Sequence, residues 1–395
     1  MDPYSNPFAP GAGCTPPELA GRDDILDEAA VACGRAARGR NARPMMLLGL
    51  RGTGKTVLLQ EIAKRSRQKD CLVTFAEASE GKPLAHLLYP EMRETLIALS
   101  NSEQSGELAK KGFHALKSFA SVCRIRTREW EAGIDPSDVS GPAASGDLQR
   151  DLADLFKLLG NAAQSAGKVW VLLIDEVQYL QNNDLSALIV VMHQVAQLSL
   201  PIVFVGAGLP QIARLAGEAR SCAERQFHFN EIGNLSAEDA EKAVRKPLEE
   251  EKASITQKAM AELFSGTQGY PFFLQAWAFH AWNIAEGPAI TEADIAASCR
   301  KTIGDLDSGF FRVRFDRLSK TEIRFVEAMA SLGDGPYAIG RIAEVLKKQP
   351  RSLGPTRASI MEKGMIYAPR YGELDFTVPL FADFMRRRNP DGAAE

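Results

Sequence analysis

The sequence lacks the features that mark membrane proteins and structural zinc proteins. No apolar run approaches the roughly 18 consecutive residues that a membrane-spanning helix needs. The 6 cysteines are scattered, no C-x-x-C pair occurs, and the 5 histidines do not cluster with them. Because structural zinc sites need closely spaced Cys and His ligands, the sequence excludes such a site. We also expect no contact with a membrane.

The sequence lacks a targeting signal and a disulfide pattern as well. Residues 1–17 are rich in Pro, Gly and Ala, but they have neither the basic n-region nor the apolar h-region of a signal peptide. We expect them to form a flexible tail. Scattered cysteines are typical of a reducing compartment, so the predicted location is the cytoplasm. Cys71 lies in an apolar run and is expected to be a core residue.

The chain has little net charge, but basic residues outnumber acidic ones near the C-terminus. Between Phe310 and Arg388 the chain has 15 Lys or Arg against 9 Asp or Glu, a net charge of +6, whereas the whole chain of 395 residues has a net charge of −3. A basic segment on an acidic body indicates a polyanionic partner at that end. The length is too great for one ordinary domain and suits two or three.

The most informative residues form a glycine-rich loop with the pattern G-x-x-x-x-G-K-[ST]. The apolar run Met45–Leu48 predicts a buried strand before the loop, and Val57–Arg65 predicts a helix after it. In this context glycines turn backbone N–H groups toward phosphate oxygens, and the helix N-terminus adds partial positive charge. The alternative is a glycine turn that binds nothing. The predicted nucleotide-binding residues here are Gly49, Leu50, Arg51, Gly52, Thr53, Gly54, Lys55, Thr56 and Val57.

Four side chains carry the predicted phosphate chemistry. Lys55 would reach the β- and γ-phosphates of ATP, and the Thr56 hydroxyl would bind Mg²⁺. The apolar run Val169–Ile174 is typical of a central parallel strand, and it ends in Asp175 and Glu176. Asp175 is the second predicted Mg²⁺ ligand, and Glu176 is the predicted group that orients and activates the attacking water. The alternative is a carboxylate pair that caps a helix.

Phosphoryl transfer also needs positive charge near the γ-phosphate. Arg220 and Arg225 precede the fifth predicted strand, and we prefer Arg225 as a catalytic residue. Because Arg225 lies far from the glycine-rich loop in the sequence, we expect it to act on the nucleotide of a neighbouring subunit, which implies a homo-oligomer. The alternative is a salt bridge at the edge of the sheet.

Strands alternate with helices from residue 18 to residue 232, which predicts an α/β core with a right-handed, mostly parallel sheet. Residues 100–147 interrupt the alternation and are interpreted as an insertion with a loop and a hairpin of Ser121–Arg126 and Trp130–Ile134. Arg124, Arg126 and Arg128 would share one hairpin face, either solvated or in contact with nucleic acid. The five predicted strands are Met45–Leu48, Cys71–Phe75, Val169–Ile174, Ile202–Val205 and Gln226–Asn230.

Two smaller domains are predicted after the core. Residues 233–305 are helical and are expected to form a lid domain, whose first helix is capped by Ser236. Residues 306–395 follow the order of a winged helix-turn-helix. Its predicted helices are Thr321–Leu332, Ala338–Leu346 and Arg351–Lys363, and its predicted strands are Met365–Pro369 and Glu373–Val378.

The third of these helices is the predicted recognition helix, and double-stranded DNA is the predicted partner. Lys and Arg supply salt-dependent affinity for phosphates, and side chains early in such a helix read base edges in the major groove. The alternative is a winged helix that binds a protein, because fold alone does not fix function. The predicted DNA-binding residues are Lys347, Lys348, Arg351, Ser352, Thr356, Arg357, Lys363 and Arg370.

The glycine-rich loop, the strand ending in Asp175 and Glu176 and the helical lid together resemble an AAA+ ATPase. The resemblance is to bacterial ATPases with an origin-recognition-complex-like domain and to the related STAND group, and it covers about residues 18–303. Leu19–Arg22 resembles the N-terminal glycine–arginine motif, which implies that Gly21 and Arg22 line the adenine pocket. Gly269–Pro271 resembles the GxP motif of the STAND lid, which implies that Pro271 packs near the nucleotide.

Two departures from the family pattern concern groups that sense the γ-phosphate. Val205–Pro210 resembles the stretch after the family's sensor strand, but Gly206–Gly208 stands where a polar sensor residue is usual. In the lid, Pro271 and Phe272 stand where replicative initiators carry an arginine. With fewer sensors, slow turnover is expected.

The sequence therefore predicts an α/β protein with a P-loop AAA+ core, a helical lid and a C-terminal winged helix. It would bind and hydrolyse Mg-ATP, release ADP, and act as a nucleotide-dependent switch on DNA. The alternative is a STAND-like regulatory or defence-system ATPase with little turnover, whose winged helix binds a protein partner. A kinase is not favoured, because nothing resembles an acceptor site. The predicted domains are residues 1–17, 18–232, 233–305 and 306–395.

Overall fold

The computed structural model describes residues 1–11, 13–101, 105–125 and 142–388. The chain divides into two compact units. The α/β unit comprises Arg22–Gly49 and Lys55–Ile232, and the helical unit comprises Met1–Gly21, Leu50–Gly54 and Gly233–Glu395. Within the described ranges, no helix is both long and apolar enough to cross a membrane.

The five strands of the α/β unit form one parallel sheet in the order β2-β3-β4-β1-β5. Every residue of β1, β3 and β4 is buried, as expected for central strands covered on both faces. The predicted α/β fold class is confirmed, although β2 and β5 each begin a little later than predicted. The strands are β1 (Met45–Leu48), β2 (Leu72–Glu77), β3 (Trp170–Asp175), β4 (Ile202–Gly208) and β5 (His228–Glu231).

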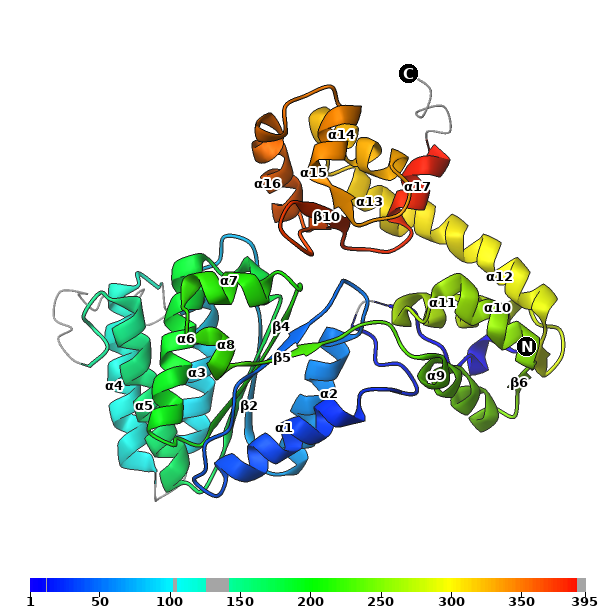
Figure 1. Cartoon of the computed structure of the whole chain (residues 1–395). Helices are drawn as coiled ribbons and strands as arrows, with labels where there is room; N and C mark the ends of the chain where they lie inside the picture. Colours follow the sequence, from blue (N-terminus) through cyan, green and yellow to red (C-terminus); the bar gives the residue numbers. More distant parts are fainter. Residues whose placement is uncertain (12, 102–104, 126–141, 389–395) are drawn as a thin grey trace. The chain divides into compact units, whose positions relative to one another are not determined.

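Helices cover both faces of this sheet (Figure 1). One face is covered by α1 (Asp23–Ala36) and α2 (Lys55–Gln68), and the other by α3 (Leu84–Ser100), α5 (Leu148–Ser165) and α6 (Asn182–Gln197). The core between β3 and α5 includes the rings of Trp170 and Phe156, whose centroids are 5.0 Å apart. Two short helices, α7 (Ile212–Ala219) and α8 (Ala223–Gln226), connect β4 to β5.

The insertion contains a helix that the sequence analysis missed. Helix α4 (Gly106–Val122) packs against α3 and α5, so the expected strand at Ser121 is wrong. The buried residues Ala109, Gly112, Leu116 and Phe119 recur at helical spacing. A Cβ at Gly112 would lie 2.5 Å from Leu96 Cδ2 on α3, so a glycine permits the close approach. Arg126, Arg128 and Trp130–Ile134 lie outside the described residues.

The first part of the helical unit is a helical bundle. Residues 1–17 were predicted to be a flexible tail, but the beginning of this segment contacts the bundle: Asn6 Nδ2 donates to the Phe279 carbonyl at 3.0 Å, and Trp282 Nε1 donates to the Asp2 carbonyl at 2.7 Å. Phe8 is also buried in the core of the unit. The elements are α9 (Ala237–Glu250), β6 (Ser254–Ile255), α10 (Gln257–Thr267), α11 (Pro271–Ile284), β7 (Ala289–Ile290) and α12 (Glu292–Asp305).

No linker separates the lid from the C-terminal elements, although the sequence predicts a domain boundary between residues 305 and 306. Helix α12 continues through a π-helical turn, Leu306–Phe311, into α13 (Arg312–Phe315). Two phenylalanines of this turn face different partners: Phe310 stacks on Phe272 of α11 with centroids 5.4 Å apart, and Phe311 packs against Phe381 near the C-terminus at 5.7 Å. The lid and the C-terminal elements therefore share one hydrophobic core.

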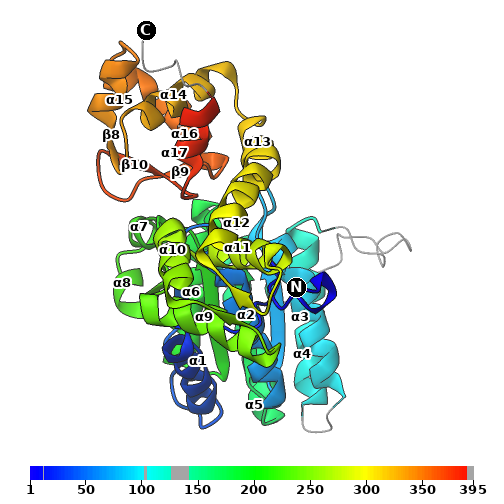
Figure 2. The same ribbon diagram turned by 90° about the vertical axis from the view of Figure 1, so that its right-hand side faces the viewer.

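The remaining elements surround a small antiparallel sheet in the order β8-β10-β9 (Figure 2). The predicted third helix is split, because Pro355 stands in its first turn and Pro350–Leu353 forms a 3₁₀ turn before it. The elements are α14 (Lys320–Ser331), β8 (Tyr337–Ala338), α15 (Ile339–Val345), α16 (Gly354–Glu362), β9 (Ile366–Tyr367), β10 (Glu373–Phe376) and α17 (Phe381–Arg388).

A buried carboxylate joins α14 to α16. The Glu322 side chain is 5% exposed, and its oxygens accept hydrogen bonds from Ser359 Oγ at 2.7 Å and Lys363 Nζ at 2.6 Å. Burial alone would raise the pKa of Glu322, but the hydrogen bonds from Lys363, Ser319 and Ser359 outweigh it and lower the pKa to about 2. The ionised form is therefore the one that the fold stabilises.

We predict that Glu322→Gln lowers stability by about 2 kcal/mol at neutral pH, because a buried charge-assisted hydrogen bond is lost. A carboxyl with a lowered folded pKa contributes stability above its unfolded pKa and loses it as pH falls. The difference in unfolding temperature between wild type and variant should shrink from pH 4.5 toward pH 2. Glu362→Gln, at an exposed position of α16, is the control. A difference that does not change with pH would refute this assignment.

Candidate nucleotide and catalytic site

The glycine-rich loop joins the C-terminal end of β1 to the N-terminus of α2. Gly49 extends the sheet, with its N–H donating to the Gly208 carbonyl of β4 at 3.0 Å. Gly52 and Gly54 have φ of +87° and +93°, in the left-handed region that side chains rarely adopt. A Cβ at Gly54 would meet nothing within 4 Å, so backbone conformation rather than crowding requires this glycine. The loop thus has the turn that directs N–H groups toward a bound phosphate.

Lys55 and Thr56 are the first residues of α2. Lys55 is 7% exposed, and an ammonium at the start of a helix beside a glycine loop suits a phosphate group. The Thr56 hydroxyl donates to Asp175 Oδ2 at the end of β3, at 2.6 Å. Two residues that lie 119 positions apart in the sequence are therefore in direct contact at one end of the sheet.

The order of the strands explains how this contact forms. β4 lies between β3 and β1, so Thr56 and Asp175 meet beyond its C-terminal end. Gly206 of β4 has no room for a side chain, because a Cβ there would lie 2.6 Å from Met46 Sδ. Met46 of β1 and Phe204 of β4 fill the space that a side chain at position 206 would need. This crowding accounts for a glycine at position 206.

The Asp175 carboxylate and the Thr56 hydroxyl are a fitting donor set for Mg²⁺, which prefers hard oxygen ligands. Asp175 is 3% exposed, and burial raises its pKa although hydrogen bonds from Thr56 and the Glu176 N–H oppose that effect. No group of three or more His, Cys, Asp or Glu that could hold a metal occurs among the described residues. A magnesium ion here would complete its coordination with water and phosphate oxygens.

Glu176 follows β3 in a left-handed conformation, with φ of +54°. Non-glycine residues in this region are uncommon and cluster at functional sites. Its carboxylate accepts a hydrogen bond from the Gln178 side-chain amide. The other end of that amide, Gln178 Oε1, accepts from the Leu209 N–H just after β4 at 3.1 Å. Gln178 therefore ties Glu176 to the end of the neighbouring strand.

Sequence reasoning missed Gln178. Its role becomes visible only when β3 and β4 are neighbours, since a Cβ on Gly208 would lie 2.5 Å from Gln178 Oε1. The glycine at the end of β4 makes room for this side chain. The sequence offers only a weak signal, which is a polar amide two residues after Glu176. The proximity of this amide to the end of β4 appears only in the fold.

The two candidate arginines behave differently. Arg220 donates from Nε to Ser186 Oγ at 2.9 Å and from Nη2 to Gln149 Oε1 at 2.7 Å, so it is engaged within its own unit. Arg225 lies on α8 and is exposed. Among the described residues it has no side-chain hydrogen bond or ion pair, so the alternative of a salt bridge at the sheet edge finds no partner. Its action on a neighbouring subunit remains a prediction.

Gly21, Arg22 and the Gly269–Pro271 motif hold tightly constrained positions. Gly21 has φ of +66°, and a Cβ there would lie 2.7 Å from Asp239 Oδ2 on α9. Arg22 is 9% exposed and precedes the first turn of α1. Gly269 has φ of +70° and accepts a hydrogen bond from the Leu235 N–H at 2.8 Å. Pro271 is the first residue of α11, where proline is favourable.

Tyr270 is a second residue that sequence reasoning missed. The residue is 1% exposed, and a Cβ on Gly52 of the loop would lie 3.0 Å from its hydroxyl. That hydroxyl has no hydrogen-bond partner among the described residues. Burial raises the pKa of Tyr270, so the group stays protonated and is a donor beside the loop. An aromatic residue in the middle of the GxP motif was the available signal.

The loop tip, Leu50–Gly54, contacts other parts of the helical unit. The Phe272 N–H donates to the Gly52 carbonyl at 3.3 Å, and the Arg51 N–H donates to the Thr377 carbonyl at 3.4 Å. A Cβ on Gly364 would lie 2.8 Å from Arg51 Nη2, so this glycine leaves space for the guanidinium. The loop thus adjoins both the lid and the segment after β10.

The predicted DNA-binding residues lie mostly on one exposed segment. Lys363 is the exception, because its ammonium donates to the Arg317 carbonyl and to buried Glu322. An internal ion pair holds this lysine, so we correct its assignment to a structural one. Ser352 also makes a local bond, donating to the Gln349 carbonyl at 2.7 Å. The exposed positions are Lys347, Lys348, Arg351, Ser352, Arg357 and Arg370, and Thr356 is half-buried.

Comparisons with known proteins support an ATPase domain. Residues 18–205 match the family model of the AAA ATPase domain, and residues 308–385 match a domain of unknown function, DUF8462. The Walker-type ATPase paby2304 of Pyrococcus abyssi shares the fold over 93% of this chain and 96% of its own, with a TM-score of 0.57 and 14% identity. The ORC2 protein of Aeropyrum pernix does so over 97% and 98%, with a TM-score of 0.51 and 13% identity.

One curated relative covers most of the chain. An uncharacterized HTH-type transcriptional regulator of Methanocaldococcus jannaschii is 24% identical over 362 residues, which are 89% of this chain and 84% of the relative. Together, the domain match and the two structures support a nucleotide-binding ATPase domain with the AAA+ fold. The glycine-rich loop and β3 both lie inside the matched region.

Proposed function

We propose that this chain, which carries a match to the AAA ATPase domain, binds and slowly hydrolyses Mg-ATP and uses the nucleotide to switch its binding of duplex DNA. The observation that carries the ATPase part is the contact between Thr56 and Asp175 at 2.6 Å beside a loop with two left-handed glycines. A loop with a purely structural role would not need a buried carboxylate at position 175. A magnesium site needs such a carboxylate as a ligand.

Each residue of the site has a distinct part in the proposed reaction. Lys55 binds the β- and γ-phosphates and balances charge that develops on them. Thr56 and Asp175 hold Mg²⁺, which supplies charge neutralisation when bound. Glu176 orients the attacking water and accepts its proton. Gln178 positions the Glu176 carboxylate through the amide hydrogen bond.

We propose slow turnover because two positions expected to sense the γ-phosphate carry residues that cannot do so. The end of β4 offers glycine in place of a polar sensor, and the lid offers Pro271 and Phe272 in place of an arginine. We propose that Arg225 of a neighbouring subunit supplies the missing positive charge, so that turnover depends on assembly of a homo-oligomer. The proposed location is the cytoplasm.

The experiment that tests this function measures the ATPase rate and the particle mass together, with and without duplex DNA. We expect measurable hydrolysis that needs Mg²⁺ and rises with assembly, and a mass increase on addition of DNA. Hydrolysis that is unchanged by protein concentration would argue against the role of Arg225 in a neighbouring subunit. A chain that binds neither nucleotide nor DNA would refute the proposal as a whole.

The DNA part of the proposal rests on the C-terminal elements. Their order is α14, the short strand β8, α15, a 3₁₀ turn, α16, the strands β9 and β10, and α17. This order supports the proposal of a winged helix-turn-helix. Their net charge suits a polyanion, and the curated relative is described as an HTH-type transcriptional regulator. We propose that α16 enters the major groove, with Thr356 and Arg357 near base edges and Arg370 at the tip of the strand pair.

We predict that reversing the charge of Lys347, Lys348, Arg351 and Arg357 lowers affinity for duplex DNA by about 100-fold or more at moderate salt. The slope of the logarithm of the binding constant against the logarithm of the salt concentration should become shallower by about 3, because each lost phosphate contact reduces it by nearly one. Fluorescence anisotropy with a labelled duplex at several salt concentrations measures both quantities. The control reverses four exposed charges of the lid region, Lys252, Lys258, Arg300 and Lys301. Equal binding by the first variant and wild type would overturn the DNA assignment.

A second candidate function is a regulatory or defence switch that turns over little and binds a protein. The contact between the Arg51 N–H and the Thr377 carbonyl favours it, because it links the loop directly to the segment after β10. In that case the C-terminal elements would bind a protein only when nucleotide releases them. Binding to DNA that is strong and salt-dependent would decide for the first candidate.

A further inference from the structure

Two cysteines that are distant in sequence lie side by side in the α/β unit. Cys33 is on α1 and is buried, whereas Cys71 stands just before β2 and is partly exposed. The two side chains are close enough for each thiol to shift the pKa of the other. Cys71 therefore does not fill the strand core as expected from the sequence. It lies beside the last turn of α2, near Cys33 of α1.

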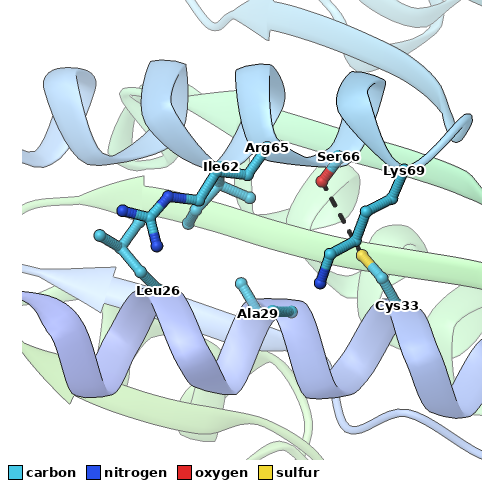
Figure 3. A pocket seen from close by; sticks show the side chains of 8 residues that line it. Leu26, Ala29, Cys33, Ile62, Arg65, Ser66 and Lys69 are labelled. Atoms are coloured by element: carbon cyan, nitrogen blue, oxygen red, sulfur yellow. Dashed lines mark hydrogen bonds between the residues drawn. The ribbon is translucent and has the colours of Figure 1, made fainter.

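The chain between α2 and β2 holds this arrangement. The Ser66 carbonyl near the end of α2 accepts from the Lys69 N–H at 3.0 Å and from the Cys71 N–H at 3.1 Å, and Asp70 takes a left-handed φ of +62°. Cys71 is thus folded back over the last turn of α2. Cys33 Sγ also lies 3.8 Å from Ser66 Oγ (Figure 3). Ser66 therefore contacts the Cys33 sulfur through its hydroxyl and the Cys71 backbone through its carbonyl.

The surroundings make Cys33 the more reactive thiol of the two. Hydrogen bonds from Cys71 and Ser66 and the charge of Lys69 outweigh burial and lower the pKa of Cys33 to about 7, whereas the pKa of Cys71 is raised. A thiolate, not a thiol, is the nucleophile in oxidation. The Lys69 side chain runs beside Cys33 in Figure 3. A buried cysteine in apolar surroundings would show the opposite shift.

A small pocket adjoins Cys33, and we infer that a small oxidant can enter it. Cys33 lines a pocket between α1 and α2 together with Leu26, Ala29, Ile62 and Ser66, and Arg65 and Lys69 complete its wall (Figure 3). Hydrogen peroxide is small and polar, and it needs only a narrow opening. Cys71, being partly exposed, is accessible from outside.

We propose that Cys33 and Cys71 form a redox couple that closes to a disulfide on exposure to hydrogen peroxide and reopens with a thiol reductant. The Cys33 thiolate attacks the peroxide, an S–O bond forms, the O–O bond breaks, and water leaves after taking up a proton. The Cys71 sulfur then attacks the Cys33 sulfur, an S–S bond forms, the S–O bond breaks, and a second water leaves with the thiol proton. Two thiols are oxidised and one peroxide is reduced to two waters.

The disulfide would join α1 covalently to the segment between α2 and β2. Since α2 begins with Lys55 and Thr56, the helix that carries two predicted phosphate ligands would be held between the loop at one end and the cross-link at the other. The proposal assigns a modification site, and it does not depend on nucleotide hydrolysis or on DNA binding.

The test uses the full chain, treated with hydrogen peroxide, alkylated without reduction and digested. We expect a linked peptide pair containing Cys33 and Cys71, lighter by two hydrogen atoms than the sum of the two peptides. Its yield should return to zero after treatment with dithiothreitol. Lys69→Gln should slow its formation several-fold, because the cation that stabilises the thiolate is removed.

Cys123→Ser is the matched control. Burial together with Asp151 and Asp184 raises the pKa of Cys123 to about 11, so this thiol should not react quickly, and the variant should still form the linked pair. Cys71→Ser should abolish it and leave Cys33 as sulfenic or further oxidised acid. Recovery of both cysteines as free thiols, or a pairing of either with another cysteine, would overturn the proposal.

Discussion

Lys55→Ala is expected to abolish measurable nucleotide binding. The substitution removes the ammonium that we propose binds the β- and γ-phosphates, and a hydrogen bond to a charged group contributes up to about 3 kcal/mol, or roughly 100-fold in affinity. Because Lys55 is only 7% exposed, solvent screens its charge little. We therefore use the free energy of a charge-assisted hydrogen bond rather than that of a surface ion pair. Isothermal titration with ATP and with ADP in the presence of Mg²⁺ measures the loss.

Lys64→Ala provides the control for this variant. Lys64 lies on the same helix with its side chain 67% exposed, so removing it changes charge and helix composition without touching the loop. We expect wild-type affinity for Lys64→Ala, and a circular dichroism spectrum of Lys55→Ala that matches wild type. If Lys55→Ala bound ATP as tightly as wild type, the phosphate site would have to lie elsewhere.

Glu176→Gln is expected to retain ATP and lose hydrolysis. The amide keeps the size of the carboxylate but cannot accept a proton from water, and general-base catalysis contributes about 10²–10⁴ to the rate. Binding should change little, since Lys55 and the Thr56–Asp175 pair remain. Single-turnover hydrolysis with labelled ATP, followed by recovery of the bound nucleotide, measures the effect.

Glu231→Gln is the comparison for this experiment. Glu231 is an exposed carboxylate at the same end of the sheet, on the last residue of β5, and its loss should leave turnover unchanged. Unchanged turnover in Glu176→Gln would remove Glu176 from the role of base. A fall in ATP affinity that equals the fall in rate would instead place Glu176 among the binding groups.

The candidate phosphate-binding residues could be predicted from the sequence because their motifs are local. The glycine spacing, Lys55 and Thr56 occupy one continuous segment, and Asp175 ends a continuous apolar run. The strand order then brings Thr56 and Asp175 together, and parallel topology makes that edge the expected place for ligands.

The residues that escaped sequence reasoning depend on contacts between distant segments. The role of Gln178 becomes apparent only from its contact with the end of β4. The role of Tyr270 becomes apparent only from its position beside Gly52. The sequence predicted Lys363 as a DNA-binding cation because its partner, Glu322, lies 41 positions away on another helix and could not be recognised. Helix α4 was missed because its apolar face uses alanine and glycine against α3, a weak hydrophobic signal for a strong packing surface.

The continuous helical segment from α12 to α13 can act as a lever for the C-terminal elements. It contains 14, 6 and 4 residues in its three helical parts, and at a rise near 1.5 Å per residue it spans about 36 Å. Rotating its lid end by about 10° would displace the other end by about 6 Å. That distance approaches two base-pair steps of about 3.4 Å. A modest rotation of the lid would therefore be enough to move basic side chains out of register with a DNA backbone.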